Sequence, residues 1–150
     1  MKQLTMKEQL SHFEHLHTTG LAYELIREIL IPDLLGKELP SILYWSGKNI
    51  ARKYPVTSEE EIKEFFRNAG WGDLSVVEIK SNGVELELRS DFITARNQSR
   101  KGSSYQLEAG FLAQQFEQLQ HLVTEAYEDQ NKRSNIVHFT VKWDKKDPIE

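Results

Sequence analysis

The chain has 150 residues, no cysteine and a formal charge of −4, from 19 Lys and Arg against 23 Asp and Glu. A domain of this length buries roughly 68–70% of its unfolded surface, so a core can form without disulfides or a structural metal. The missing cysteines exclude disulfides, thiolate nucleophiles, iron–sulfur clusters and cysteine-based zinc sites.

The charge is spread evenly along the chain, which argues against binding to nucleic acid or to a membrane surface. Residues 1–7 have no apolar segment typical of a signal peptide, and no run approaches the ~20 apolar residues of a membrane span. We therefore expect a cytoplasmic protein with no cofactor, and one domain over residues 1–150.

The first third of the chain predicts helices. Residues 4–16 form a weakly amphipathic segment, either a helix or part of a loosely docked arm over residues 1–19. Apolar residues at helical spacing predict a helix over residues 21–31, ended by Pro32 because proline disfavours helical geometry in the residue before it.

A further helix is predicted from Pro40 to the residue before Pro55, and the small Ser46 and Gly47 within it indicate close packing against a neighbour. The next helix is expected to begin at a capping box with Thr57 as the N-cap and Glu60 three residues later. It is expected to stop at Gly70, the residue type that usually follows a helix end.

The hydrophobic period then changes from 3.6 to 2. Strands are predicted over residues 74–80 and 84–89, joined by a tight turn at Asn82-Gly83 that places Ile79 opposite Leu86 and Val77 opposite Leu88. Residues 90–104 look like a polar connection.

The long helix that follows, up to residue 120, carries Gly110 in its middle. Glycine costs about 1 kcal/mol there relative to alanine, so either another backbone comes close or space is left beside the helix. Two more strands are predicted, at 123–128 and at 136–143. The whole pattern predicts an α+β fold with N-terminal helices packed on one face of a four-stranded antiparallel sheet, in the order ααα(α)-ββ-α-ββ.

No catalytic or metal-binding motif stands out, so we expect no enzyme and no metal site. His12, His15 and His17 lack the spacing of a zinc-protease helix and are better explained as solvated side chains. No G-x-S-x-G nucleophile elbow or glycine-rich phosphate loop is present.

Large aromatic residues and one acidic residue are the candidates for lining a ligand pocket: Tyr23, Trp45, Glu108, Phe111 and Phe116. The aromatic residues could equally be simple core. Glu108 lies beside the apolar stripe of the long helix, so it either pairs with Arg27, Arg52 or Arg96 or grips a ligand.

Two of the predicted helices carry apolar residues on more than one face, which suggests a second packing partner and a homodimer. The candidate contact residues are Leu25, Ile29, Leu43, Tyr44, Gly47 and Ile50.

Five segments in order resemble the YslB-like family of uncharacterised proteins from Gram-positive bacteria. They are AYELIRE at 22–28, LYWSGK at 43–48, GWG at 70–72, YQLEAGF at 105–111 and TVKWD at 140–144. The resemblance covers roughly residues 21–148.

More distantly, that family resembles a superfamily of ligand-binding domains, with nitric-oxide sensors, vinyl-reductase-type domains and Golgi transport subunits among its members. The resemblance implies helices on a four-stranded antiparallel sheet, a pocket between the two layers and a tendency to self-associate. It does not extend to haem, because the Y-x-S-x-R motif is missing, nor to metal or lipid attachment through cysteine.

Two hypotheses follow. The first is a non-enzymatic module that binds or senses a small apolar molecule in a pocket between helices and sheet. The alternative is a homodimeric structural or protein-interaction module without a ligand.

Overall fold

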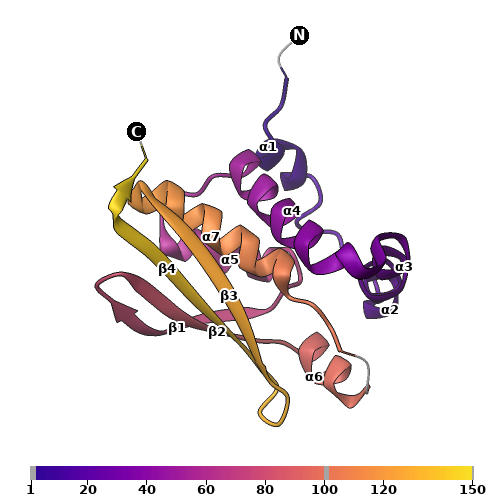
Figure 1. Ribbon diagram of the computed structural model, residues 1–150. Coiled ribbons are helices and arrows are strands. Elements are labelled where there is room, and N and C mark those ends of the chain that lie inside the picture. The colour runs from indigo at the N-terminus through magenta and orange to yellow at the C-terminus, as the bar shows by residue number, and fades with distance from the viewer. Residues whose placement is uncertain (1–2, 100–101, 150) are drawn as a thin grey trace.

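The computed structural model describes residues 3–99 and 102–149. It shows an α+β fold in which helices cover one face of a four-stranded antiparallel sheet, with the strand order β1-β2-β4-β3 (Figure 1). The elements follow the predicted order of helices, two strands, a helix and two strands, with one additional short helix after the first strand pair.

The sheet consists of β1 (Asp73–Lys80), β2 (Gly83–Arg89), β3 (Leu122–Asn131) and β4 (Ile136–Pro148). The central strands β2 and β4 bring buried side chains opposite one another on the helix-facing side, for example Leu86 against Phe139. Alternate residues therefore build one apolar face, which is the period-2 pattern expected of a half-covered antiparallel sheet.

The first hairpin is present, but its predicted register is wrong. Its two-residue connection is Ser81-Asn82, so Ile79 pairs with Val84 rather than with Leu86. An irregularity between Val76 and Glu78 then shifts the strand, and Val77 and Ile79 are exposed on this edge strand, at 53% and 74%. A β-bulge of this kind adds a residue that reverses which side chains face inward, and the alternation in the sequence does not reveal it.

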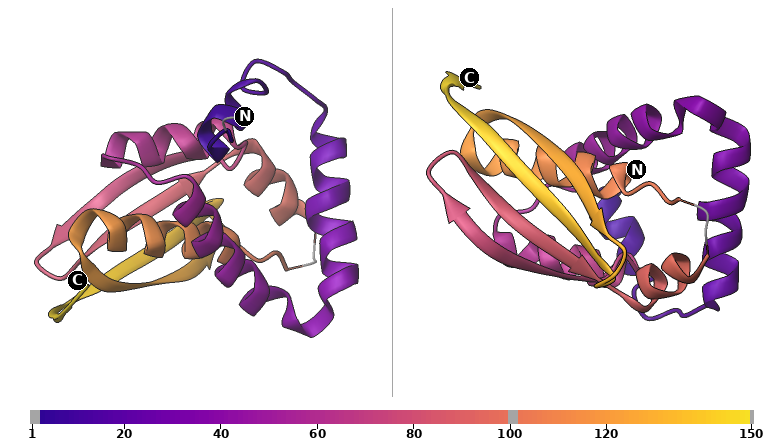
Figure 2. Two further views of the ribbon diagram at one scale, coloured as in Figure 1. Left: turned by 90° about the horizontal axis from the view of Figure 1, so that it is seen from above. Right: turned by 60° about the horizontal axis from the view of Figure 1, so that its bottom comes forward.

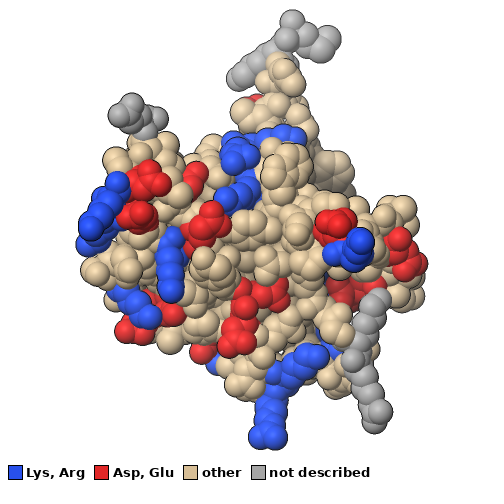
Figure 3. All heavy atoms as spheres, in the orientation of Figure 1, with Lys and Arg blue, Asp and Glu red and all other residues tan. Residues whose placement is uncertain are grey.

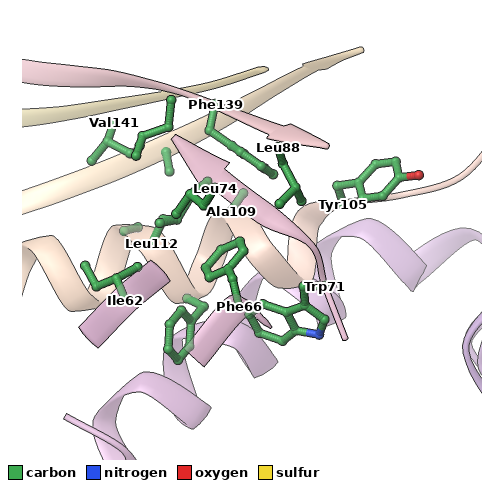
Figure 4. Close-up of a cluster of buried hydrophobic side chains, with 14 of the residues drawn as sticks. Ile62, Phe66, Trp71, Leu74, Leu88, Tyr105, Ala109, Leu112, Phe139 and Val141 are labelled. Carbon is green, nitrogen blue, oxygen red and sulfur yellow. The ribbon is translucent and has the colours of Figure 1, made fainter. Parts of the chain in front are cut away.

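The helix α7 (Gln106–Gln120) lies at the centre of the molecule, and every residue from Glu108 to Phe116 is buried. Figure 4 shows Ala109 and Leu112 of this helix facing core residues of the sheet such as Phe139 and Val141. The core is therefore a layer between α7 and the sheet, and the predicted α+β fold with helices on a four-stranded antiparallel sheet is confirmed.

Against the other side of α7 packs α4 (Leu39–Lys53). The two helices touch through glycines on both sides. A Cβ atom on Gly110 would overlap the carbonyl oxygen of Tyr44, and one on Gly47 would lie 2.7 Å from the backbone nitrogen of Phe111. The close approach predicted from Gly110 and Gly47 is confirmed, and each helix accepts the lower helix propensity of glycine to permit it.

The helix α5 (Glu59–Asn68) covers the same core with Ile62 and Phe66, and it ends at Gly70 in the left-handed region, with φ 75°. Its predicted cap is displaced by one residue. Ser58 accepts the hydrogen bond from the Glu61 backbone N–H at 3.3 Å, while Glu61 accepts from the backbone and hydroxyl of Thr57. The prediction of Thr57 as the N-cap is therefore wrong by one residue, because serine and threonine are both good N-caps and Ser58 also has a glutamate three residues later.

One uninterrupted helical run spans residues 20–35, hereafter the outer helix. It consists of α2 (Gly20–Glu24), a π-helical segment η1 (Leu25–Leu30) and α3 (Ile31–Leu35), and a 3-10 turn η2 (Gly36–Glu38) links it to α4. The prediction that Pro32 ends the helix is wrong. The chain changes to i→i−5 bonding just before it, as in the bond from Ile31 N–H to the Ile26 carbonyl. The helix therefore widens where a proline would otherwise clash with the preceding turn.

The predicted polar connection after β2 contains a short helix, α6 (Asp91–Gln98). Ser90 caps it by accepting from the Ile93 N–H at 3.0 Å, and Ile93 is fully buried. With few apolar residues in eight, this segment shows no stripe that pattern analysis can detect.

At the N-terminus, α1 (Met6–Ser11) forms a short helix capped by Thr5. None of residues 3–19 is buried. That α1 and the segment after it form a loosely docked arm remains a prediction, as does the single domain over residues 1–150.

Candidate ligand groove

The main candidate site is a groove between the outer helix and α6, which lie across from one another at one end of the molecule (Figure 2). Its volume is about 470 Å³. The apolar wall residues are Leu21, Leu25, Ile29, Phe92 and Ala95. The polar residues that line it are Glu24, Glu28, Arg96, Ser99 and Ser103. An apolar lining with a few placed polar groups is the usual character of a small-molecule site.

The charged residues in the groove are already paired within the chain. Arg96 is only 9% exposed and donates from Nε to the Glu24 carboxylate at 2.9 and 3.1 Å. Its Nη1 lies 3.4 Å from the hydroxyl of Tyr105. Ser103 donates to Glu28. The polar side of the groove therefore holds the Arg96–Glu24 ion pair and the Glu28 carboxylate, which also lies 3.8 Å from Nε of Arg27.

A second ion pair lies directly behind the first. Glu108 is 1% exposed, and both of its carboxylate oxygens accept from Arg27 Nη2, at 2.7 and 2.8 Å. Arg27 also donates from Nη1 to the hydroxyl of Tyr23 at 3.0 Å. Three arginines were candidates for pairing with Glu108, and Arg27 is the one that does so. The prediction that Glu108 pairs with an arginine is confirmed.

The two guanidinium groups share one aromatic ring. The Cζ atoms of Arg27 and Arg96 lie 5.6 and 5.7 Å from the centre of the Tyr105 ring. Burial alone would lower the pKa of Arg27, but the adjacent carboxylate of Glu108 raises it above its usual value. Burial likewise opposes the charge of Arg96, and its hydrogen bond to Glu24 raises the pKa. Both arginines are therefore charged at any pH at which the protein is folded.

The five residues predicted to line one pocket are not brought together. Tyr23 and Glu108 meet through Arg27, behind the groove. Phe111 stacks on Phe65 in the core, Phe116 stacks on Trp143, and Trp45 is 61% exposed on α4.

Sequence reasoning missed the contribution of α6, which supplies Phe92, Ala95 and Arg96 to the groove. The available signal was Ser90, a good N-cap placed at the end of a strand and three residues before the apolar Ile93.

The residues predicted to form a dimer interface divide into two groups. Leu25 and Ile29 of the outer helix are each 51% exposed. On α4, by contrast, Gly47 is covered by α7, and Tyr44 accepts a hydrogen bond from the Ala126 N–H of β3 at 3.1 Å. Leu43 and Ile50, also on α4, are half-buried.

Another hollow, of about 570 Å³, lies where α5, β1, β2 and α6 meet. Its charged residues are of both signs, with Arg67 and Arg89 alongside Asp73 and Asp91. Figure 3 shows positive and negative side chains mixed over one face of the molecule. These observations agree with the even distribution of charge in the sequence.

Metal and membrane features are missing from the described part of the chain. Residues 3–99 and 102–149 contain no cluster of three or more His, Cys, Asp or Glu placed to hold a metal ion. Within the same ranges, no helix has the length and apolar character needed to cross a bilayer.

The α+β fold is similar to that of one solved structure. A crystal structure of a vinyl-4-reductase family protein from Methanocaldococcus jannaschii superposes with a TM-score of 0.65, covering 89% of this chain and 87% of that one. At 19% sequence identity, this likeness shows the fold alone.

The sequence defines the family more closely. Residues 20–142 match the profile of the family described as "Protein of unknown function (DUF2507)". The chain is also 44% identical to "Uncharacterized protein YslB" of Bacillus subtilis (strain 168) over 140 residues, which cover 93% of this chain and 95% of that protein. The chain belongs to the DUF2507 family, and the resemblance to YslB-like proteins is confirmed.

Proposed function

We propose that this protein is a non-enzymatic module that binds a small apolar or amphipathic molecule in the groove between the outer helix and α6. The observation that carries the proposal is the groove itself, whose apolar walls surround the paired Arg96 and Glu24, of which Arg96 is buried and Glu24 half-buried. The vinyl-4-reductase-like fold supports a small-molecule-binding role. The proposed location differs from the expected pocket between helices and sheet, because large side chains such as Phe111 and Phe139 fill that space.

The chemistry of the groove favours binding over catalysis. A catalytic acid, base or nucleophile needs a reactive side chain that points at the reacting atoms. The charged side chains that line this groove are instead engaged with partners in the chain. We infer that a ligand gains its affinity from apolar contact. The half-buried Ser103 hydroxyl, which donates to Glu28 but can still accept a hydrogen bond, and the edge of the Glu24 carboxylate would orient its polar end.

The test combines native mass spectrometry with a groove-filling variant. Protein purified from its own host is expected to retain a small molecule in the native spectrum and to release it on denaturation. The variant Ala95→Trp places an indole in the groove from an exposed position on α6, so it should not disturb the core. We expect it to lose the retained mass and to weaken binding of the apolar dye anilinonaphthalene sulfonate at least about tenfold.

The matched control is Gln98→Trp, which introduces the same indole at an exposed position of the same helix that does not line the groove. It should bind dye like the unmodified protein. The proposal is refuted if no mass is retained and the dye binds Ala95→Trp and Gln98→Trp equally well.

A further inference from the structure

The outer helix is amphipathic, but most of its charged residues face the protein and its large apolar residues face solvent. Three of its four charged residues, Glu24, Arg27 and Glu28, face the protein and are buried or half-buried, while Asp33 near its end is exposed. Its large apolar residues face solvent with exposures of 50–72%: Leu21, Leu25, Ile26, Ile29, Leu30 and Leu34. A surface helix normally buries its apolar stripe, so this arrangement indicates that something else covers the outward face.

The π-helical segment gathers these six side chains into one stripe. In a regular α-helix of about 100° per residue they would spread over about 220° of the circumference. With i→i−5 bonding and about 4.4 residues per turn across residues 25–30, the spread falls to about 130°. The wider turn therefore converts a diffuse apolar helix into one with a defined contact face.

The stripe is symmetric about its own centre. Leu21 and Leu34, Leu25 and Leu30, and Ile26 and Ile29 are equidistant from the midpoint between residues 27 and 28. Each pair also consists of the same residue type. When two identical helices pack antiparallel across a two-fold axis at this midpoint, each side chain meets its pair-mate in the other copy.

We propose that the apolar stripe of the outer helix is a homodimer interface, formed with the outer helix of a second copy running antiparallel about a two-fold axis between residues 27 and 28. Six side chains that are half exposed or more offer on the order of 600 Å² per copy, against about 800 Å² per partner in an interface of standard size. Flanking residues of a two-fold pair would supply the remainder. The self-matching pattern favours a second copy over an unrelated protein.

A membrane surface is a poorer fit to the same stripe. A helix that lies in a bilayer interface usually carries lysine and arginine on its opposite face, free to meet lipid headgroups. Here the opposite face is turned into the protein, and its Arg27 is engaged with Glu108.

The pairing also bears on the groove. Leu21, Leu25 and Ile29 belong to both the stripe and the groove wall. In the proposed dimer their partners are Leu34, Leu30 and Ile26 of the second copy, so the second copy closes one side of the groove. This consequence rests on the proposed ligand function, whereas the pairing itself does not.

The first experiment measures mass in solution by sedimentation or light scattering at tens of micromolar. We expect a particle of twice the 17.5 kDa chain mass. The double variant Leu30→Glu/Leu34→Glu introduces charge at two exposed positions that do not line the groove, and it should raise the dimer dissociation constant at least about 100-fold. The control Ile79→Glu changes an apolar residue of similar exposure on β1 and should remain dimeric.

The second experiment tests the antiparallel register of the two outer helices by thiol crosslinking. The chain has no cysteine, so only the introduced thiols can react. Leu21→Cys and Leu34→Cys are both highly exposed, at 70% and 72%. In the antiparallel pair, residue 21 of one copy lies against residue 34 of the other, while the two copies of residue 21 are separated by about 20 Å along the axis. A short crosslinker should join the two variants when they are mixed and neither variant when it is alone.

The possible results separate the alternatives. A monomeric wild-type protein at 100 µM overturns the dimer, and binding of that monomer to lipid vesicles would identify a membrane as the occupant. Crosslinking of Leu21→Cys to itself overturns the antiparallel register. Because both experiments read mass or crosslinks, their failure leaves the dye-binding test of the groove unaffected.

Discussion

The glycine contact between α4 and α7 leads to a quantitative prediction for Gly110→Ala. In an exposed helix this change stabilises by about 1 kcal/mol, because alanine is the better helix former. Here the new methyl group would overlap the Tyr44 carbonyl oxygen and lie 2.8 Å from its carbonyl carbon. Ordinary carbon contacts begin near 3.5 Å, so the helices must separate by about 1 Å.

Such overpacking typically costs 1–3 kcal/mol and occasionally more, which outweighs the gain in helix propensity. We expect a net loss of about 2 kcal/mol in the free energy of unfolding, or roughly 4–8 °C in Tm for a domain of this size. Urea denaturation and a thermal melt measure it. Gly102→Ala is the control, because nothing lies within 4 Å of the added methyl group. A Gly110→Ala protein as stable as the wild type would refute the close approach.

Two further predictions concern the buried polar groups. Glu108→Ala leaves Arg27 charged, buried and without its carboxylate, so it should lower the free energy of unfolding by about 3–5 kcal/mol. The apolar double variant Arg27→Met/Glu108→Leu should recover most of that loss in urea denaturation, and a double variant less stable than Glu108→Ala would contradict a paired arrangement. For Tyr44, burial and the hydrogen bond to Glu125 raise the pKa above its ordinary value of 10.0. The neutral phenol is then favoured in the folded state, so its contribution to stability is fully present below about pH 10 and is lost as the pH rises towards the folded pKa. Tyr44→Phe should accordingly be less stable at pH 8 but show a flatter decline above pH 10, and a parallel decline would exclude Tyr44 as the titrating group.

Most of the fold was predictable because it depends on periodicity. The strand pairs, the long helix and the two glycines at its crossing all follow from residue spacing and residue size. The bulge in β1 and the π-helical turn before Pro32 were not, because each inserts one residue's worth of backbone without changing the local composition. In β1 the prediction fails in which side chains are paired, and at Pro32 it fails in where the helix ends.

The candidate site was less predictable, since it depends on a contact between segments far apart in the chain. That Glu108 pairs with an arginine follows from the rule that buried carboxylates need a partner, but Arg27 lies 81 residues away. The short helix α6 was not predicted, and neither was the place of its Arg96 and Phe92 in the wall of the groove. Of the aromatic residues chosen for a pocket, Phe111 and Phe116 belong to the core, where their size serves packing, and Trp45 is exposed.

The two outer margins of the sheet constrain how copies of this protein can associate. Along β3, the Tyr44 hydroxyl and the Glu117 carboxylate accept hydrogen bonds from the N–H groups of Ala126 and Thr124. Along β1, the irregularity after Val76 breaks the straight row of donors and acceptors that an added strand would need. Neither edge strand therefore favours the addition of further strands that would extend the sheet into a fibre. An association restricted to one self-matching helical stripe closes on itself after two subunits.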